Sequence, residues 1–346
     1  MKIALVCPSN KLFMPYVSNY ELILSHLNIP YDIINWDRFK IENSHISYKD
    51  KKIGHKRSYY DYLKYKKYLL YKLTYEKYDK IIVFGIQLSY FLKNILIKKY
   101  KKNFVIDIRD YNKIKHFFNL KKLIQYTSFT VISSACYKEW LPENLNYLIN
   151  HNTQITCINE LKEIRPFNQQ KIGIANIGAI RDFEINKELI QSLSNNNRFE
   201  MFFHGESEIN ENIQKFVEVN KIKNVLITGR YLKDVEEQLY NNCDLVNVLR
   251  YNDSINNKTA LPNRIYNSVI HGKPMIAYEG TYLADQISKY NLGIVLSSFS
   301  NVDQNIIKYL TQFNTEEFNE GRKRFISKTI NENNLFKKNL IKFINS

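Results

Sequence analysis

The sequence predicts an α/β protein made of two doubly wound, Rossmann-like domains that face a cleft. Strand-like and helix-like segments alternate with short connections, which is typical of parallel sheets covered by helices on both faces. The alternation stops at a polar stretch, residues 154–170, and then restarts. Glycines and polar residues gather just after the strand-like segments, where open parallel sheets bind their ligands.

The first half contains short apolar runs that we interpret as buried strands. These are KIALVCP, YDIINW, KIIVFG, NFVIDIRD, FTVISSA and NYLINHNT. Helices are predicted over YVSNYELILSHLNI and IQLSYFLKNILIKKY, and from CYKEWLP onward. The opening segment is interpreted as a strand and not as a signal peptide, because its apolar stretch is short and Pro8 interrupts it. No apolar run reaches the ~18 residues of a membrane span.

The second half repeats the same pattern. Its predicted strands are KIGIANIG, FEMFFHG, KNVLITG, CDLVNVLR, MIAY and LGIVL. Helices are predicted over EINKELIQSLSNN, INENIQKFVEVN, LKDVEEQLYNN and NRIYNSVIHG, and over two charged stretches at the end. Asn263 is expected to cap the fourth of these helices, and Gly272 and Pro274 are expected to end it.

The net charge of +16 is concentrated in the first half. Residues 1–160 carry 26 Lys and Arg against 13 Asp and Glu, whereas residues 161–346 carry 24 against 21. Lysine and tyrosine interleave over residues 48–80. Such a surface attracts a nucleic acid, a membrane of acidic lipids or a phosphorylated substrate. A plain solvated helix face, encoded by an AT-rich genome, is the alternative interpretation.

Missing motifs exclude several kinds of site. There is no G-x-x-x-x-G-K-[ST] loop, no G-x-G-x-x-G after the first strand and no G-x-S-x-G. Because D-x-D is also absent, we expect no metal, and a diphosphate would be held by basic side chains and helix N-termini. The cysteines are interpreted as reduced core thiols of a cytoplasmic protein, with a disulfide as the alternative. They are Cys7, Cys136, Cys157 and Cys243.

The segment NIGAIRDFEINKEL offers groups that can hold a diphosphate. Gly178 follows a predicted strand, Arg181 comes three residues later, and Lys187 lies at the start of a helix. A glycine lets a ligand approach the backbone, and two nearby cations can neutralise its charge. The alternative is that Arg181 pairs with Asp182 or Glu184 at the surface.

Four segments together resemble the C-terminal domain of GT-B-fold glycosyltransferases, most closely those of family 4. In chain order they are GAIR with a following lysine, FFHGES, VLITGRYLKDVEEQLYNNCDLVNVL and LPNRIYNSVIHGKPMIAYEGTYLADQI. The resemblance covers about residues 171–296, and the first half matches more loosely. It implies an acceptor-binding domain over residues 1–153, a linker over 154–170 and a nucleotide-sugar domain over 171–320. Residues 321–346 are expected to form a helix that packs back toward the first domain.

The resemblance also implies roles for single residues. Arg181 and Lys187 match the cationic positions that hold the diphosphate of the donor. Asn267 stands where the family usually has a glutamate that binds the nucleotide ribose, and Thr259 stands where a second glutamate is common. A neutral amide can still hydrogen-bond a hydroxyl. The implied donor-binding positions are Gly178, Gly205, Gly229, Arg230, Tyr231, Asn263, Asn267, Glu279, Gly280 and Thr281.

The implied reaction is the metal-independent transfer of a sugar from a nucleotide diphosphate sugar, with UDP favoured, to an acceptor hydroxyl. Arg181 and Lys187 would stabilise the leaving diphosphate. In an inverting enzyme Asp110 would take the acceptor proton, and in a retaining enzyme it would position the acceptor. The structural alternative for Asp110 is a salt bridge with Arg109 or a turn cap.

Enzymes that resemble this sequence often act in bacterial surface polysaccharide or capsule synthesis. This implies a lipid-linked or oligosaccharide acceptor and a peripheral position on the inner face of the plasma membrane, where Lys and Tyr meet acidic headgroups. Three alternatives stay open: a sugar-nucleotide 2-epimerase on the same fold, a nucleic-acid-binding protein and a non-catalytic transferase-like partner. No nucleic-acid-binding module is recognised, so we expect no nucleic-acid partner.

Overall fold

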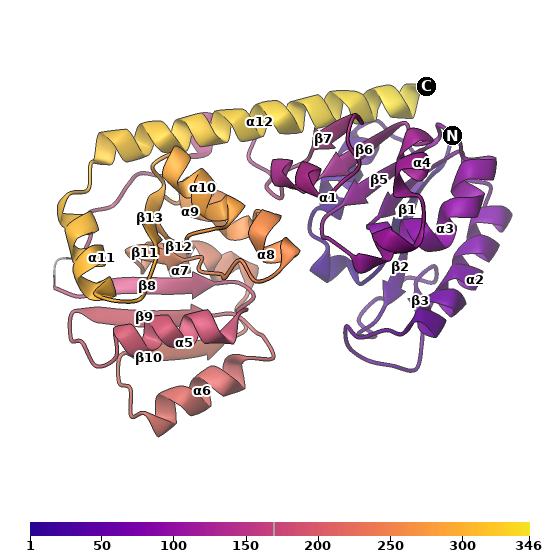
Figure 1. Cartoon of the computed structure of the whole chain (residues 1–346). Coiled ribbons are helices and arrows are strands. Elements are labelled where there is room, and N and C mark those ends of the chain that lie inside the picture. Colours follow the sequence, from indigo (N-terminus) through magenta and orange to yellow (C-terminus); the bar gives the residue numbers. More distant parts are fainter. Residues whose placement is uncertain (169) are drawn as a thin grey trace. The chain divides into compact units, whose positions relative to one another are not determined.

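The computed structural model describes residues 1–168 and 170–346, and the chain divides into two compact units (Figure 1). Unit 1 comprises Met1–Gln154 and Asn331–Ser346, and unit 2 comprises Ile155–Ile330. Each unit has one parallel sheet, of seven strands in unit 1 and six in unit 2, with flanking helices. The α/β, doubly wound fold class is therefore confirmed. Residue 169 of the predicted linker lies outside the described residues.

The sheet of unit 1 has the strand order β3-β2-β1-β4-β5-β6-β7. Its strands are β1 (Ile3–Cys7), β2 (Tyr31–Asp37), β3 (Tyr48–Lys49), β4 (Lys80–Phe84), β5 (Phe104–Ile108), β6 (Phe129–Ile132) and β7 (Tyr147–Ile149). Its helices are α1 (Val17–His26), α2 (Tyr59–Tyr75), α3 (Ile86–Lys99) and α4 (Leu120–Gln125), with 3-10 turns η1 (Lys11–Phe13), η2 (Lys113–Phe117) and η3 (Ala135–Glu139). The near-continuous apolar strands are buried, as expected when helices cover both faces of a parallel sheet.

The last helix, α12 (Thr315–Asn345), contributes side chains to the core of unit 1. Phe336, Leu340 and Phe343 pack with α1 and with strand residues such as Leu5. The ammonium group of Lys80 donates hydrogen bonds to the carbonyl oxygens of Phe343 and Ile344, which lie in the last turn of α12. This helix end is therefore fixed by a buried cation as well as by apolar packing.

The sheet of unit 2 has the strand order β10-β9-β8-β11-β12-β13. Its strands are β8 (Ile172–Ile177), β9 (Phe199–His204), β10 (Val225–Gly229), β11 (Leu245–Asn247), β12 (Met275–Tyr278) and β13 (Gly293–Leu296). Its helices, besides the first part of α12, are α5 (Phe183–Ser192), α6 (Asn210–Val219), α7 (Glu236–Asn241), α8 (Ile255–Thr259), α9 (Asn263–Ile270), α10 (Tyr282–Lys289) and α11 (Val302–Thr311), with 3-10 turns η4 (Ile158–Glu160) and η5 (Lys233–Val235).

Two apolar layers enclose this sheet, because successive strand side chains point to opposite faces. Ile172 and Ile174 of β8 pack with α5, α6 and α11. Ala175 and Ile177 of the same strand pack with α7, α9, α10 and α12. In open parallel sheets of this kind, the loops after the carboxyl ends of the strands form the ligand site.

Several local expectations are wrong. Asn263 is the first residue of α9, and Pro262 occupies the cap position without a side-chain bond. The expected helix from CYKEWLP is the short 3-10 turn η3, and the helices α4 and α8 fall where no helix is predicted. The long helix α2 lies in the Lys and Tyr stretch, where a helix face was only the alternative interpretation. All four cysteines are free, but Cys157 is exposed and Cys136 is half-buried, so only Cys7 and Cys243 are core thiols.

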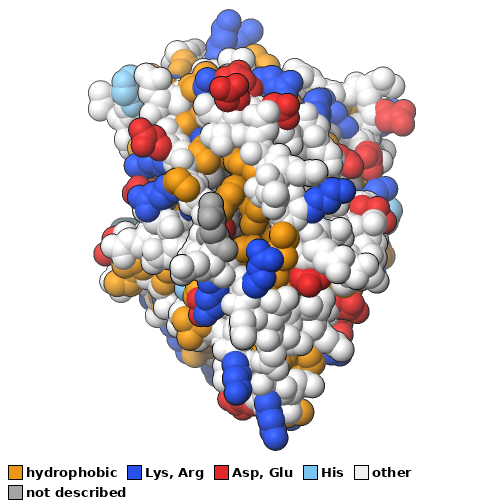
Figure 2. Space-filling view, turned by 90° about the vertical axis from the view of Figure 1, so that its left-hand side faces the viewer, with side chains coloured by type: hydrophobic (Ala, Val, Ile, Leu, Met, Phe, Trp, Pro, Cys, Tyr) orange, Lys and Arg blue, Asp and Glu red, His pale blue; other side chains and the backbone are white. Residues whose placement is uncertain are grey.

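One face of the molecule carries charged side chains of both signs (Figure 2). Figure 2 shows a face on which cationic and anionic side chains are interspersed, with a narrow strip of hydrophobic side chains near its middle. A mixed surface of this kind produces no large field of one sign. Within the described residues, no helix is long and apolar enough to cross a membrane.

Candidate functional site

The strand order of unit 2 places a topological switch point between β8 and β11. From β8 the chain continues to β9 and β10 on one side, and it then returns to β11 and β12 on the other. The loops after β8 and β11 therefore diverge, and this is where open parallel sheets form their ligand crevice. Gly178 begins the loop after β8 with a positive φ of 100°, so its backbone adopts a conformation that favours glycine.

Arg264 joins the two diverging loops. This residue lies in the first turn of α9, and its guanidinium donates hydrogen bonds to the carbonyl oxygen of Ala179 and, at 3.1 Å, to that of Asn247. Burial lowers the pKa of Arg264 to about 10, and the positive charges of Arg250 and Arg181 act in the same direction. Three guanidinium groups thus share the switch point, where they favour an anion.

Of the two cations predicted from the sequence, Arg181 belongs to this group, and Lys187 lies on the helix that follows the same loop. Arg181 is exposed in the loop between β8 and α5, and among the described residues it forms no ion pair, so the alternative pairing with Asp182 or Glu184 is absent. Lys187 lies in the second turn of α5, with its ammonium 3.6 Å from a carboxylate oxygen of Glu184. An anion at the N-terminus of α5 would compete with Glu184 for Lys187.

A carboxylate, that of Glu236, also lies near the switch-point loop. The amide nitrogen of Asn267 donates a hydrogen bond of 3.0 Å to Oε1 of Glu236 at the start of α7. Burial, followed by the negative charge of Glu236, raises the pKa of Tyr231 to about 12. A Cβ atom placed on Gly178 would lie 4.0 Å from the Tyr231 hydroxyl. Tyr231 and Asn267, both predicted from the sequence, therefore meet beside Glu236, which the sequence analysis did not identify.

The remaining predicted glycines shape the loops at the same edge of the sheet. Gly205 follows β9 with a φ of 149°, and a Cβ there would lie 1.9 Å from the carbonyl oxygen of Gly178. Gly229 and Gly280 also have positive φ, of 69° and 77°. Of these three glycines, only Gly205 would bring a Cβ against backbone atoms, so it has the strictest need for glycine among them.

Other predicted residues have structural contacts of their own. The hydroxyl of Thr281 is buried and accepts a hydrogen bond from the backbone N–H of Ala284, which caps α10. Thr259 is buried and donates to the carbonyl oxygen of Ile255 within α8. Glu279, Arg230 and Asn263 are exposed at the carboxyl edge or at the start of α9.

In unit 1 the acidic end of β5 is organised around Arg109. Its guanidinium binds both carboxylate oxygens of Asp107 at 2.6 Å, donates to the carbonyl oxygen of Asn150 and lies over the ring of Tyr16. The charge of Asp107 holds the pKa of Arg109 above its ordinary value despite the burial that opposes it. Arg109 is thus held by Asp107, and Asp110, the predicted base, is exposed immediately after it.

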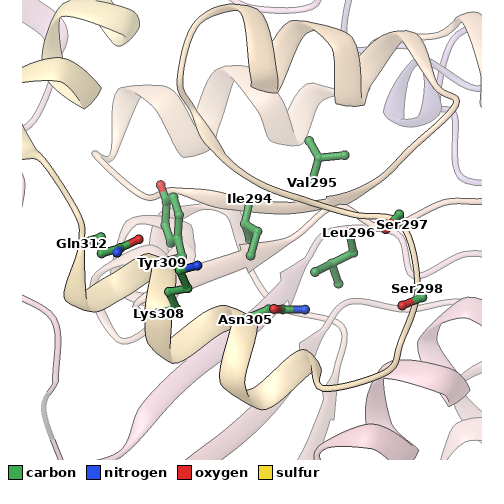
Figure 3. A pocket seen from close by; sticks show the side chains of 9 residues that line it. All are labelled: Ile294, Val295, Leu296, Ser297, Ser298, Asn305, Lys308, Tyr309 and Gln312. Carbon is green, nitrogen blue, oxygen red and sulfur yellow. The ribbon is translucent and has the colours of Figure 1, made fainter.

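A hollow in unit 2 lies apart from this edge group. It has a volume of about 350 Å³ and lies between the edge strand β13 and α11, where Tyr309 stands beside Ile294 and Lys308 supplies the cation of the lining (Figure 3). None of the predicted site residues lines it. Within residues 1–168 and 170–346, no three His, Cys, Asp or Glu side chains are grouped as metal ligands.

The fold corresponds to that of several solved enzyme structures. Sucrose-phosphate synthase from Thermosynechococcus elongatus is similar over 98% of both chains, with a TM-score of 0.70 and 10% identity. The lipopolysaccharide outer core galactosyltransferase WaaB is similar over 99% of both chains, with a TM-score of 0.65 and 13% identity. These likenesses show the GT-B fold of glycosyltransferases, which the sequence resemblance predicted.

A third similar structure contains ligands. Anabaena HepE, solved in complex with UDP and glucose, matches 99% of this chain and 100% of its own, with a TM-score of 0.63 and 11% identity. No protein-family description and no curated protein sequence matches the chain. The likeness therefore lies in the fold.

Proposed function

We propose that this chain is a glycosyltransferase that moves a sugar from a UDP-sugar to an acceptor hydroxyl. The observation that carries the proposal is the group of three guanidiniums, Arg181, Arg250 and Arg264, at the switch point of unit 2. A diphosphate supplies the negative charge that such a group favours. The complexes of HepE with UDP and with UDP-glucose, on the same fold, support the choice of nucleotide.

The chemistry follows from the charges. The bond between the sugar C1 and the β-phosphate oxygen breaks, and a bond from C1 to the acceptor oxygen forms. Negative charge develops on the leaving UDP, and the cationic side chains of Arg181 and Lys187 stabilise it, with Lys187 exchanging its contact with Glu184 for the diphosphate. The acceptor proton goes to a carboxylate of unit 1, for which Asp110 is the proposed base.

We further propose that the acceptor is a lipid-linked glycan of surface polysaccharide synthesis and that unit 1 binds an anionic membrane surface. One side of α2 supports this proposal. Tyr60, Tyr71 and Tyr75 are exposed there, with Lys64 and Lys67 between them in the sequence. The single acidic residue of α2, Asp61, is buried. Tyrosines at the interface and lysines against acidic headgroups suit such a surface.

The donor site is tested by binding without added metal. Calorimetry and thermal unfolding would compare UDP, UDP-glucose, GDP, dTDP and CMP on the unaltered protein, on Arg181→Ala and on Arg198→Ala. Arg198 is an exposed arginine before β9, at the opposite edge of the sheet. We expect UDP to bind and raise the melting temperature, and we expect Arg181→Ala to weaken binding about tenfold or more.

The control defines what contradicts the proposal. Arg198→Ala removes the same charge from the unit, so equal weakening by both variants would mean that only net charge matters. Absence of stabilisation by any nucleotide up to millimolar concentration would reject the donor site. Consumption of the UDP-sugar without any acceptor would instead favour an epimerase.

A further inference from the structure

We propose that Glu236 binds the ribose hydroxyls of the nucleotide and that Asn267 is the positioning residue that orients its carboxylate. This inference rests on the proposed function, because it assigns a further residue to the same donor site. It is drawn from the surroundings of Glu236, which differ from those of an ordinary surface carboxylate.

Glu236 is half-buried and accepts a hydrogen bond of 3.0 Å from Asn267. Among the described residues it forms no ion pair. Its neighbour Glu237 is exposed and lies 3.2 Å from the ammonium of Lys162, as a solvated surface pair would. A carboxylate removed from water is normally compensated by charge or by several hydrogen bonds. The Tyr231 hydroxyl is a second side-chain partner of Glu236. A carboxylate has about four acceptor positions, so these two partners leave lone pairs of Glu236 for another donor.

The position of Glu236 points this carboxylate toward the switch point. Its charge acts on the phenol of Tyr231, and the Tyr231 hydroxyl lies over Gly178 in the loop after β8. The charge of Arg264, whose guanidinium binds the next residue of that loop, acts on the same phenol. The guanidinium of Arg264 and the carboxylate of Glu236 therefore both lie near the loop that begins at Gly178.

A ligand that satisfies both sides must be anionic at one end and a hydrogen-bond donor at the other. Phosphate groups belong with the guanidiniums, because Glu236 would repel them. Vicinal hydroxyls are donors, and their bonds to a carboxylate are charge-assisted and short. A nucleoside diphosphate has both parts, a diphosphate and a ribose diol. The geometry thus assigns the diol to Glu236.

The test compares nucleotides that differ by one hydroxyl. Dissociation constants of UDP, 2′-deoxy-UDP and 3′-deoxy-UDP would be measured by calorimetry for the unaltered protein, Glu236→Ala, Glu236→Gln and Asn267→Ala. We expect the unaltered protein to bind UDP about 10- to 100-fold more tightly than at least one deoxy analogue. Glu236→Ala should reduce this ratio to about threefold or less, with Glu236→Gln and Asn267→Ala between the two.

Glu237→Gln is the matched control, because it removes the adjacent carboxylate of the same helix and should keep the full ratio. Thermal unfolding of each variant shows that it is folded. If Glu236→Ala does not fold, the near-isosteric Glu236→Gln still provides the test. If the unaltered protein binds UDP and its deoxy analogues equally, or if Glu236→Ala keeps the ratio, the inference is wrong while the donor site stands. If no nucleotide binds, the proposed function fails and the inference fails with it.

Discussion

At the scale of single residues, the carboxyl edge of unit 2 depends on how closely two loops approach. Gly205 leaves no room for a side chain, because a Cβ atom would lie 1.9 Å from the carbonyl oxygen of Gly178. Gly229, at the end of the neighbouring strand, also has a positive φ, but nothing lies within 4 Å of its Cβ position. Alanine substitutions at these two positions therefore distinguish the cost of steric overlap, at Gly205, from the cost of backbone strain alone, at Gly229.

We expect Gly205→Ala to lower the stability of unit 2 by more than about 2 kcal/mol, because the backbone of Gly178 must move. Gly229→Ala should cost about 1 kcal/mol, from strain alone. Calorimetric unfolding, with hydrogen exchange of peptides from β8 and β9, would measure both effects. Equal losses in the two variants would mean that the loops can move apart at little cost.

Residue chemistry also explains which site residues the sequence could indicate. Gly178, Arg181 and Lys187 lie within ten positions of one another, so a local motif identifies them together. Glu236 and Asn267 are 31 positions apart and meet only through a side-chain hydrogen bond. No periodicity or spacing brings such a pair to notice, because neither residue belongs to a linear motif with the other.

At the scale of elements, α2 shows how one helix combines a buried side with an exposed one. Tyr62 and Tyr65 pack against Trp36, whereas Tyr60, Tyr71 and Tyr75 are exposed. The helix begins with a capping box, in which Ser58 and Asp61 exchange hydrogen bonds between side chain and backbone. Interleaved Lys and Tyr thus form a two-sided helix, which the composition of residues 48–80 does not reveal.

The capping carboxylate makes stability depend on pH. The hydrogen bond from Lys52, followed by that from the Ser58 backbone, holds the pKa of Asp61 well below its ordinary value of 3.8. Because the folded pKa is lower than the unfolded one, Asp61 stabilises unit 1 above about pH 4, and this stabilisation is lost as the pH falls. Asp61→Asn should lower the free energy of unfolding by about 0.5–2 kcal/mol at pH 7. The difference between the variant and the unaltered protein should disappear between about pH 5 and pH 2.

Urea unfolding followed by tryptophan fluorescence measures this effect, because both tryptophans, Trp36 and Trp140, lie in unit 1. The matched control is Asp234→Asn, which changes an exposed aspartate of unit 2 and should leave the transition in place. If the difference in unfolding free energy between Asp61→Asn and the unaltered protein stays constant with pH, the Asp61 carboxylate is not the source of the pH dependence.

At the scale of the whole molecule, the uneven charge of the chain predicts where a membrane would bind. The first 160 residues hold most of the net charge of +16. We expect Lys64→Glu with Lys67→Glu to weaken binding to vesicles of phosphatidylcholine and phosphatidylglycerol at least about 30-fold, at ~1 kcal/mol for each lysine lost and more for the reversal of its charge. Cosedimentation at low and high salt would measure this, and the binding should fall with salt.

Lys215→Glu with Lys221→Glu changes the net charge equally, on exposed positions in and just after α6 of unit 2. This control should lose much less binding. If both double variants lose vesicle binding equally, the total charge of the protein determines binding, and the exposed Lys and Tyr side of α2 does not. Equal binding to vesicles without phosphatidylglycerol would contradict an electrostatic contribution.

The sequence by itself determined the alternation of strands and helices, the two sheets and the cationic turn after β8, because these follow from local apolar periodicity and from adjacent residues. The sequence did not predict the short elements η3, α4 and α8 correctly, because a helix of five or six residues covers less than two turns and has little periodicity to detect. Only the tertiary structure decided that Arg109 binds Asp107, that Thr281 caps α10, and that Arg264 and Glu236 face the loop of Gly178. Parallel strands bring their carboxyl ends to one edge regardless of their distance in the chain, so contacts across that edge are set by strand order and not by sequence spacing.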